Sequence, residues 1–312
     1  MSQLILKRLI SLPFVIFSIT FITFLVGYLA PGDPILAMMG SRTDPATYDR
    51  LRHLYGLDLP WYIQYGNYIS GLLQGNLGLS FRYQGRPVWD MISSGVPVSF
   101  SLGIVALSLS LVIGVPVGLW AALKQNSLFD RASMSLMLIL YAVPSFVLIP
   151  TLRWINYQFY LRNLPSLPVA GWGKPENWIL PVIVLAAASM GFMARLTRTS
   201  MLDVLHQDYI RTAAAKGLRE RRVRWVHAFR NALLPIVTVI GPSIAFLVTG
   251  AFVVENLFAI PGIGFLSVQA ISQRDYPVIQ STTVLLAVAV LLMNLVTDLL
   301  YGVLDPRVSL RG

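Results

Sequence analysis

The chain has 312 residues, of which 55% are hydrophobic and only 12% are charged, and its formal net charge is +10. Soluble domains usually carry about 25% charged residues, so a surface that faces water everywhere is excluded. The sequence has no cysteine, which excludes disulfides and thiolate metal sites, and its three histidines (His53, His206 and His227) are far apart and do not suggest a metal site.

Six charge-free runs are each long enough for one membrane-spanning helix, because about 20 apolar residues cross the hydrocarbon core. We therefore predict an all-α polytopic membrane protein with six transmembrane helices. The first run exceeds the core of a normal signal peptide, so we expect an uncleaved anchor. The runs are 9–32, 91–123, 132–152, 177–194, 231–254 and 276–297.

A seventh uncharged run, 256–273, has a different composition. It contains Pro261, Gly262 and Gly264 together with several polar side chains. Glycine and proline disfavour helices, and exposed polar groups are costly in lipid. We expect an outer loop or a partly re-entrant segment there.

Lysine and arginine predict the orientation, because cytoplasmic loops carry an excess of both. With six spans, the basic residues before the first span, between spans two and three, between spans four and five, and after span six all fall on one side. That side is expected to be the cytoplasm, so both termini would be cytoplasmic.

The predicted organisation has three parts: 1–32 with the cytoplasmic N-terminus and first span, 33–90 as an extracytoplasmic segment, and 91–312 as a five-span core with a cytoplasmic loop at 195–230. The extracytoplasmic segment is rich in tyrosine and tryptophan, which suit the membrane interface. Either a lid on the lipid surface or a docking surface for an outer partner fits this composition. Residues 157–178, rich in proline and glycine, are predicted to form an outer loop.

The cytoplasmic loop holds nine basic and three acidic residues, a net charge of +6. Good helix formers dominate it, and Gly217 is the one expected break. A basic loop could simply touch anionic lipid. Topology alone, however, needs neither nine charges nor the small-residue patch Thr212-Ala213-Ala214-Ala215. We therefore expect a helix that docks on another protein.

This loop also carries a recognisable motif. The stretch from Asp208 to Leu218 (DYIRTAAAKGL), followed by RNALLP at 230–235, resembles the EAA signature of ABC importer permeases, in the form found in the dipeptide, oligopeptide and nickel permease family. Arg211-Thr212-Ala213 stand where Glu-Ala-Ala would be. Five further stretches resemble that family in order, namely LAPGDP at 29–34, GLLQGNLGLS at 71–80, FVVENLFAIPGIG at 252–264, DYPVIQ at 275–280 and LDPR at 304–307.

The resemblance is to the first of two paired permeases and implies a type I ABC importer permease fold in the bacterial inner membrane. It implies a heterodimer with a second permease, two cytoplasmic ATPase subunits and an extracytoplasmic substrate-binding protein. The substrate would be a dipeptide, an oligopeptide or a related solute such as a nickel chelate or glutathione. The implied ATPase-coupling residues are Asp208, Arg211, Thr212, Ala213, Ala214, Ala215, Lys216, Gly217, Leu218 and Glu220.

No catalytic, cofactor or metal site is predicted, and the residues that contact substrate are left open. The chain lacks the Gly-x-x-x-x-Gly-Lys-Ser/Thr phosphate loop, so ATP and magnesium are expected in the partner ATPase subunits. One alternative is a self-contained channel or secondary carrier, which would favour intramembrane charges or an internal repeat. Another is a membrane enzyme with clustered histidine or carboxylates. Neither pattern stands out.

Overall fold

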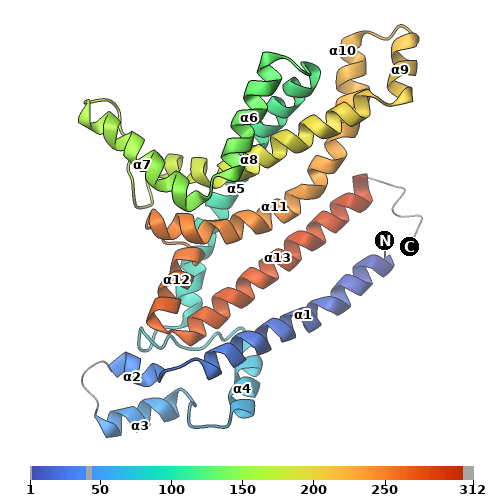
Figure 1. Cartoon of the computed structure of the whole chain (residues 1–312). Coiled ribbons are helices and arrows are strands. Elements are labelled where there is room, and N and C mark those ends of the chain that lie inside the picture. The colour runs from blue at the N-terminus through green and yellow to red at the C-terminus, as the bar shows by residue number, and fades with distance from the viewer. Residues whose placement is uncertain (1, 40–43, 305–312) are drawn as a thin grey trace. The chain divides into compact units, whose positions relative to one another are not determined.

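The computed structural model describes residues 2–39 and 44–304, and this part of the chain is helical without a strand. The all-α prediction is confirmed (Figure 1). The elements are α1 Ser2–Leu29, α2 Pro34–Met39, α3 Pro45–Leu54, α4 Trp61–Leu73, α5 Val88–Leu123, α6 Leu128–Ala142, α7 Ser145–Leu161, α8 Glu176–Leu205, α9 Asp208–Ala215, α10 Glu220–Arg222, the π-helix η1 Val223–Phe229, α11 Arg230–Leu257, α12 Ile263–Gln273 and α13 Tyr276–Leu304.

Among the described residues, four helical stretches are long and apolar enough to cross a membrane, or five if a bent pair counts as one span. The four are Ile10–Leu29, Val88–Leu123, Glu176–Leu205 and Tyr276–Thr297. They coincide with the first, second, fourth and sixth predicted spans. The fifth predicted span falls in α11, where part of the side chains lie outside the described residues.

The third predicted span is not one straight helix. Its residues are divided between α6 and α7, and the helix direction bends by 110° between the two. The break lies at Val143, whose backbone is extended (φ −78°, ψ 118°), and Pro144 caps the start of α7. Proline disfavours the helical conformation of the residue before it and has no N–H to continue the ladder. The uninterrupted helix expected over 132–152 is therefore corrected to a bent pair.

The seventh run also differs from an irregular outer loop, because Ile263–Gln273 form the helix α12. Gly262 precedes it with extended backbone, and Ile263, Gly264, Ser267 and Ala270 are its buried residues. An 11-residue helix is about 16 Å long, too short to cross the hydrocarbon core. Spacing of the buried positions by one, three and three residues gives the helix one packed face.

The chain divides into two compact units. The first unit comprises residues 100–260 and 292 onward, and the second comprises residues 2–99 and 261–291. α5 and α13 contribute to both.

In the first unit, α8 packs closely against both α5 and α6. A side chain at Gly118 of α5 would collide with the backbone of Ala194, and one at Gly191 of α8 would collide with the backbone of Met137 in α6. Small residues allow helices in membranes to approach this closely. The hydroxyl of Ser110 also donates to the carbonyl of Ala186 at 3.1 Å, so α5 and α8 are joined by packing and by a buried hydrogen bond.

The predicted outer loop at 157–178 is irregular between the end of α7 and the start of α8. It is nevertheless tied down. The amide of Asn156 donates to the carbonyl of Leu167 and accepts from its N–H, at 2.9 and 2.8 Å. Trp172 stacks on Trp178 with ring centroids 4.3 Å apart. These contacts hold the connector against the helices that it joins.

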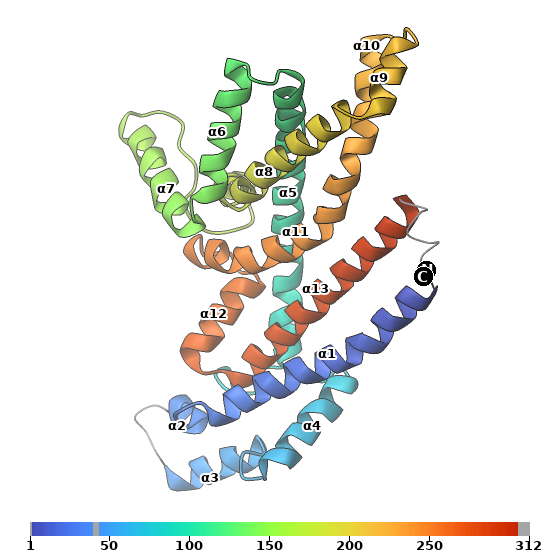
Figure 2. The same ribbon diagram turned by 45° about the vertical axis from the view of Figure 1, so that its right-hand side comes forward.

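In the second unit, the described residues between α1 and α5 form three short helices and a turn. α4 packs against α1, as Figure 2 shows most clearly, and the Tyr65 ring lies 5.4 Å from the Phe21 ring while its hydroxyl lies 3.1 Å from that of Thr20. The buried carboxylate of Asp275 accepts hydrogen bonds from the hydroxyl of Ser80 and from the N–H of Phe81. The segment is thus structured, and its turn is fixed to the residue before α13.

Candidate coupling site

The segment singled out in the basic loop at 195–230 forms a short helix that ends in a turn. α9 runs over Asp208–Ala215, and Gly217 follows with a φ of +77°. That left-handed backbone costs an ordinary residue about 1–2 kcal/mol, so glycine is favoured here. The predicted break at Gly217 is confirmed, but the expectation of a single break is wrong, because α8 ends at Leu205 and α9 begins only at Asp208 after the extended Gln207. The chain then re-enters helix at α10 and passes through η1 into α11.

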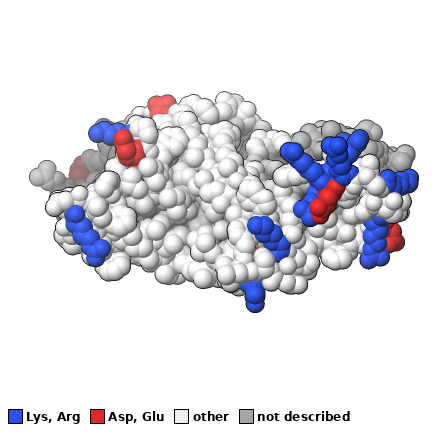
Figure 3. Space-filling view, turned by 90° about the horizontal axis from the view of Figure 1, so that it is seen from above, with Lys and Arg blue, Asp and Glu red and all other residues white. Residues whose placement is uncertain are grey.

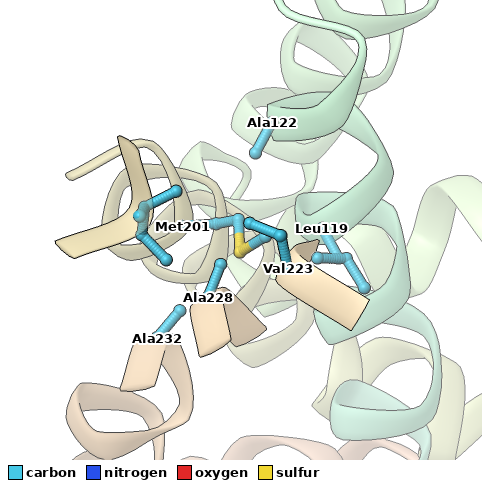
Figure 4. Packing of buried hydrophobic residues seen from close by; sticks show 7 residues of the cluster. Leu119, Ala122, Met201, Val223, Ala228 and Ala232 are labelled. Atoms are coloured by element: carbon cyan, nitrogen blue, oxygen red, sulfur yellow. The ribbon is translucent and has the colours of Figure 1, made fainter. Parts of the chain in front are cut away.

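One face of α9 is anchored in an apolar cluster within the first unit. Ile210 is 6% exposed, and the partly buried Ala213 and Leu218 pack against the same cluster. Burying an isoleucine side chain contributes about 2 kcal/mol, and this anchor joins α9 to α5, α8, η1 and α11. Figure 4 shows members of the cluster converging from these helices; its buried residues are Leu119, Ala122, Met201, Ile210, Val223, Ala228 and Ala232.

The other face of α9 is open. Arg211, Thr212, Ala214 and Ala215 are exposed, and the Thr212 hydroxyl donates to the carbonyl of Asp208 at 2.9 Å. The guanidinium of Arg211 lies 3.6 Å from the Asp208 carboxylate, with both side chains largely in solvent. Solvent screens such a pair, so it contributes little to holding the helix. This face therefore offers small side chains and mobile charge to a partner.

A hydrogen bond joins α9 to the start of the fifth predicted span. The side-chain amide of Asn231 donates to the Tyr209 hydroxyl at 2.8 Å and to the carbonyl of His227 at 2.9 Å. The two residues lie on α9 and α11, so a displacement of α9 acts on α11 directly. Sequence reasoning quoted both residues within the motif but assigned neither a role, because nothing in the spacing shows that they meet.

Basic residues surround this segment. Figure 3, viewed from the side of α9 and α10 in Figure 1, shows lysine and arginine gathered beside a few carboxylates, with much of the remaining visible surface uncharged. Glu220 and Arg224 form an ion pair one turn apart. Both residues line a cavity of about 450 Å³. Lys124 and His206, which follow the ends of α5 and α8, also line it.

The ten residues predicted for coupling lie together. Six are in α9, Lys216 to Leu218 form the turn after it, and Glu220 begins α10. Ala213 and Leu218 face the apolar cluster, whereas the other eight are exposed. Within the described part of the chain, no group of three histidine or carboxylate side chains could hold a metal ion. Sequence reasoning missed Ile210, although it is the one large aliphatic residue between Asp208 and Gly217.

Comparisons with known proteins agree with this geometry. Residues 114–310 match the family described as binding-protein-dependent transport system inner membrane component, and residues 1–103 match the N-terminal region of such components. The chain belongs to this family. It is 41% identical over 310 residues to the dipeptide transport system permease protein DppB of Bacillus subtilis, covering 99% of both chains. It is 38% identical to the DppB of Escherichia coli K12, again over 99% of each.

The fold matches that of the inward-facing methionine ABC transporter MetNI, with a TM-score of 0.57 over 69% of this chain and 96% of that one, at 17% identity. The fold is thus that of a type I ABC importer permease. As a family member, the chain is a permease subunit of an ATP-driven, binding-protein-dependent importer in the inner membrane. Membership implies a separate ATPase and a binding protein as partners.

Proposed function

We propose that this chain forms half of the translocation pathway for dipeptides, oligopeptides or a related small solute. The observation that carries this substrate class is similarity along nearly the entire chain, at 38–41% identity, to permeases named for dipeptide transport. The second half of the pathway is a related permease in a heterodimer. Twelve helices around one cavity enclose a peptide-sized path more readily than six.

The motive force comes from two cytoplasmic ATPase subunits. ATP and its magnesium ion are held there, and this chain receives mechanical work. The exposed face of α9 is the contact, because it presents Arg211, Thr212 and two alanines to the outside while Ile210 anchors the helix from behind. Small side chains let a partner's backbone approach closely, as a helix seated in a cleft requires.

Packing within the first unit supports a lever. A displacement of α9 acts on α11 through Tyr209 and Asn231, and on α8 through the shared apolar cluster. α8 in turn contacts α6 through a cation–π interaction, because the guanidinium of Arg195 on α8 lies 4.3 Å from the centre of the Tyr141 ring on α6. Closely packed helices move as one body rather than deforming. Movement of the ATPase subunits is therefore passed to several spans together.

The same proposal places both termini in the cytoplasm. Basic residues between α5 and α6 and between α8 and α11 would then face the cytoplasm, in agreement with the positive-inside rule. An outer binding protein would deliver substrate to the opposite side. Docking by residues 33–90 is part of this proposal, since that segment is structured and carries several exposed aromatic side chains.

The deciding experiment measures transport by the assembled complex. Vesicles containing this chain, its paired permease and both ATPase subunits are supplied with the binding protein, labelled dipeptide and internal ATP. We expect uptake that needs all components and that is competed by unlabelled di- or oligopeptides. Uptake by this chain alone, driven by an ion gradient, would instead favour a secondary carrier. ATP-driven uptake that peptides fail to compete would overturn the substrate class only.

A further inference from the structure

The second unit contains a cavity of about 770 Å³ that the transport cycle does not account for. Its lining comes from the end of α1, the segment from Gly32 to Phe81, and the first turns of α13. Pockets that hold small molecules typically measure about 300–1,000 Å³. The cavity is therefore large enough for a ligand, and its walls indicate which kind.

One wall lies within the membrane-spanning part of the chain. Phe24, Gly27 and Tyr28 line it from the last two turns of α1, and Phe24 stands about 8 Å along the axis from the end of the helix at Leu29. A side chain at Gly27 would meet the ring of Tyr276 at 3.4 Å, so α1 ends where α13 begins. Both helices are candidate spans. This wall is thus at the depth where acyl chains meet headgroups, whichever way the chain is oriented.

Other residues of the lining are polar and carry both signs of charge. Asp33 and Arg52 are among them, together with amide side chains such as Asn67. The Asp33 carboxylate already accepts hydrogen bonds from the Tyr48 hydroxyl at 2.6 Å and from the N–H of Ile35 at 2.8 Å, which fix its position. The lining therefore combines a fixed carboxylate and a guanidinium with aromatic side chains.

One buried polar atom of a lining residue has no hydrogen-bond partner in the described part of the chain. The phenolic oxygen of Tyr68, on α4, is buried and has no hydrogen-bond partner among the described residues. Buried hydroxyls normally have a partner, because leaving one unpaired costs about 1–3 kcal/mol. Burial also raises the pKa of Tyr68 to about 12, so the group stays protonated and can donate.

We propose that this cavity binds one zwitterionic phospholipid, such as phosphatidylethanolamine. Arg52 pairs with the phosphate, Asp33 receives the ammonium group, and the upper acyl chain lies against Phe24 and Tyr28. Membrane lipid is the ligand that this depth supplies, and the far side of α1 carries exposed Ile22 and Val26 that already face it. The bound lipid would fix the three short helices of the second unit on the membrane.

The test uses the assembled transporter, purified in mild detergent and extensively delipidated, with retained lipid measured by native mass spectrometry. We expect retention of phosphatidylethanolamine by Arg52→Gln to fall roughly tenfold, as expected for loss of a charge-assisted pair. Arg50→Gln is the matched control, because Arg50 is exposed on the same helix and outside the lining. It should retain lipid like the wild type.

Two further variants separate the ligand classes. Asn67→Trp should fill the cavity and expel the lipid, whereas Gly66→Trp, outside the lining, should not. Asp33→Asn should abolish the preference for phosphatidylethanolamine over phosphatidylglycerol. Equal retention by wild type, Arg52→Gln and Asn67→Trp would overturn the site. Displacement of the bound molecule by a water-soluble dipeptide would also overturn the proposal, in favour of a site for cargo.

Discussion

The guanidinium of Arg198 on α8 donates two hydrogen bonds to the carboxylate of Asp130 on α6. One runs from Nε to Oδ1 at 2.6 Å and the other from a terminal nitrogen to Oδ2 at 2.8 Å. The carboxylate is also held by the N–H of Asn126 at 2.9 Å, and its side chain is only 4% exposed. A forked pair of this kind fixes orientation as well as distance. The loop between α5 and α6 is thereby bonded to the helix that leads into α9.

Removing one partner of this pair should loosen the first unit. In Arg198→Gln the Asp130 carboxylate is left buried without its counter-charge, which costs about 3–5 kcal/mol. We expect a lower thermal midpoint for the purified complex and weaker coupling of ATP hydrolysis to uptake. The exposed Arg162, at the end of α7, provides the control Arg162→Gln. Stability equal to wild type in Arg198→Gln would mean that the pair contributes nothing to the packing of α6 on α8.

Burial of Ile210 should be needed for transport but not for membrane insertion. Ile210→Ala removes the anchor of α9, and truncations of this kind cost about 2–5 kcal/mol. We expect normal amounts of protein in the membrane, reduced co-purification of the ATPase subunits and reduced uptake. Ala214→Ser, on the exposed face, is a mild control for the helix itself. If Ile210→Ala keeps full uptake, α9 needs no fixed seat in the apolar cluster.

Much of the fold follows from the sequence, because the hydrocarbon core penalises charge and so charge-free runs coincide with helices. The turn at Gly217 could also be predicted, because glycine disfavours a helix. The bend at Pro144 was not, since Pro150 and Pro181 lie inside α7 and α8 without ending them. Whether a proline ends a helix here depends on how the neighbouring helices pack around it. A sequence pattern does not show that packing.

The candidate site shows the same division. Its residues were predicted from their motif, whereas the contacts that hold them were not predicted. Asp130 and Arg198 are 68 residues apart and Tyr209 and Asn231 are 22 apart, so only the folded chain brings each pair together. Local patterns report what a segment prefers, whereas a pairing between distant polar side chains depends on where helices meet.

The turn around Ser80 should depend on Asp275. This buried carboxylate accepts from the Ser80 hydroxyl and from the N–H groups of Phe81 and Arg82, the last at 3.3 Å. Asp275→Asn weakens these charge-assisted bonds, so the turn should open more often. We expect trypsin to cleave after Arg82 several times faster in the purified complex. The variant Asp90→Asn, at an exposed carboxylate, serves as control, and unchanged cleavage in Asp275→Asn would contradict the assignment.

The bent pair α6 and α7 should cross the membrane once. The chain has no cysteine, so single cysteines can be introduced without a background. Gln125 and Lys174 are exposed positions on either side of the pair. An impermeant maleimide added to intact spheroplasts should label Lys174→Cys, and Gln125→Cys should react only after the membrane is opened. Labelling of both from the outside would mean that the pair returns to its starting face, which would end the six-span topology.

Gly217 has two possible functions, to allow the left-handed turn or to leave room for a partner's backbone, and two substitutions distinguish them. Among the described residues other than its two chain neighbours, no atom lies within 4 Å of where a Cβ would stand, so the φ of +77° is the constraint on the residue. Gly217→Leu would strain the turn and add bulk, whereas Gly217→Asn adds bulk at a backbone conformation that asparagine tolerates. We expect Gly217→Leu to insert normally but to lose uptake, with the ATPase subunits either released or hydrolysing ATP without transport. Near-normal coupling in Gly217→Asn would assign the role to the turn, and its loss would assign it to a partner backbone seated against α9. ATPase activity and uptake are measured on the same vesicles. If both variants couple hydrolysis to uptake as the wild type does, this segment is not the site through which the ATPase acts.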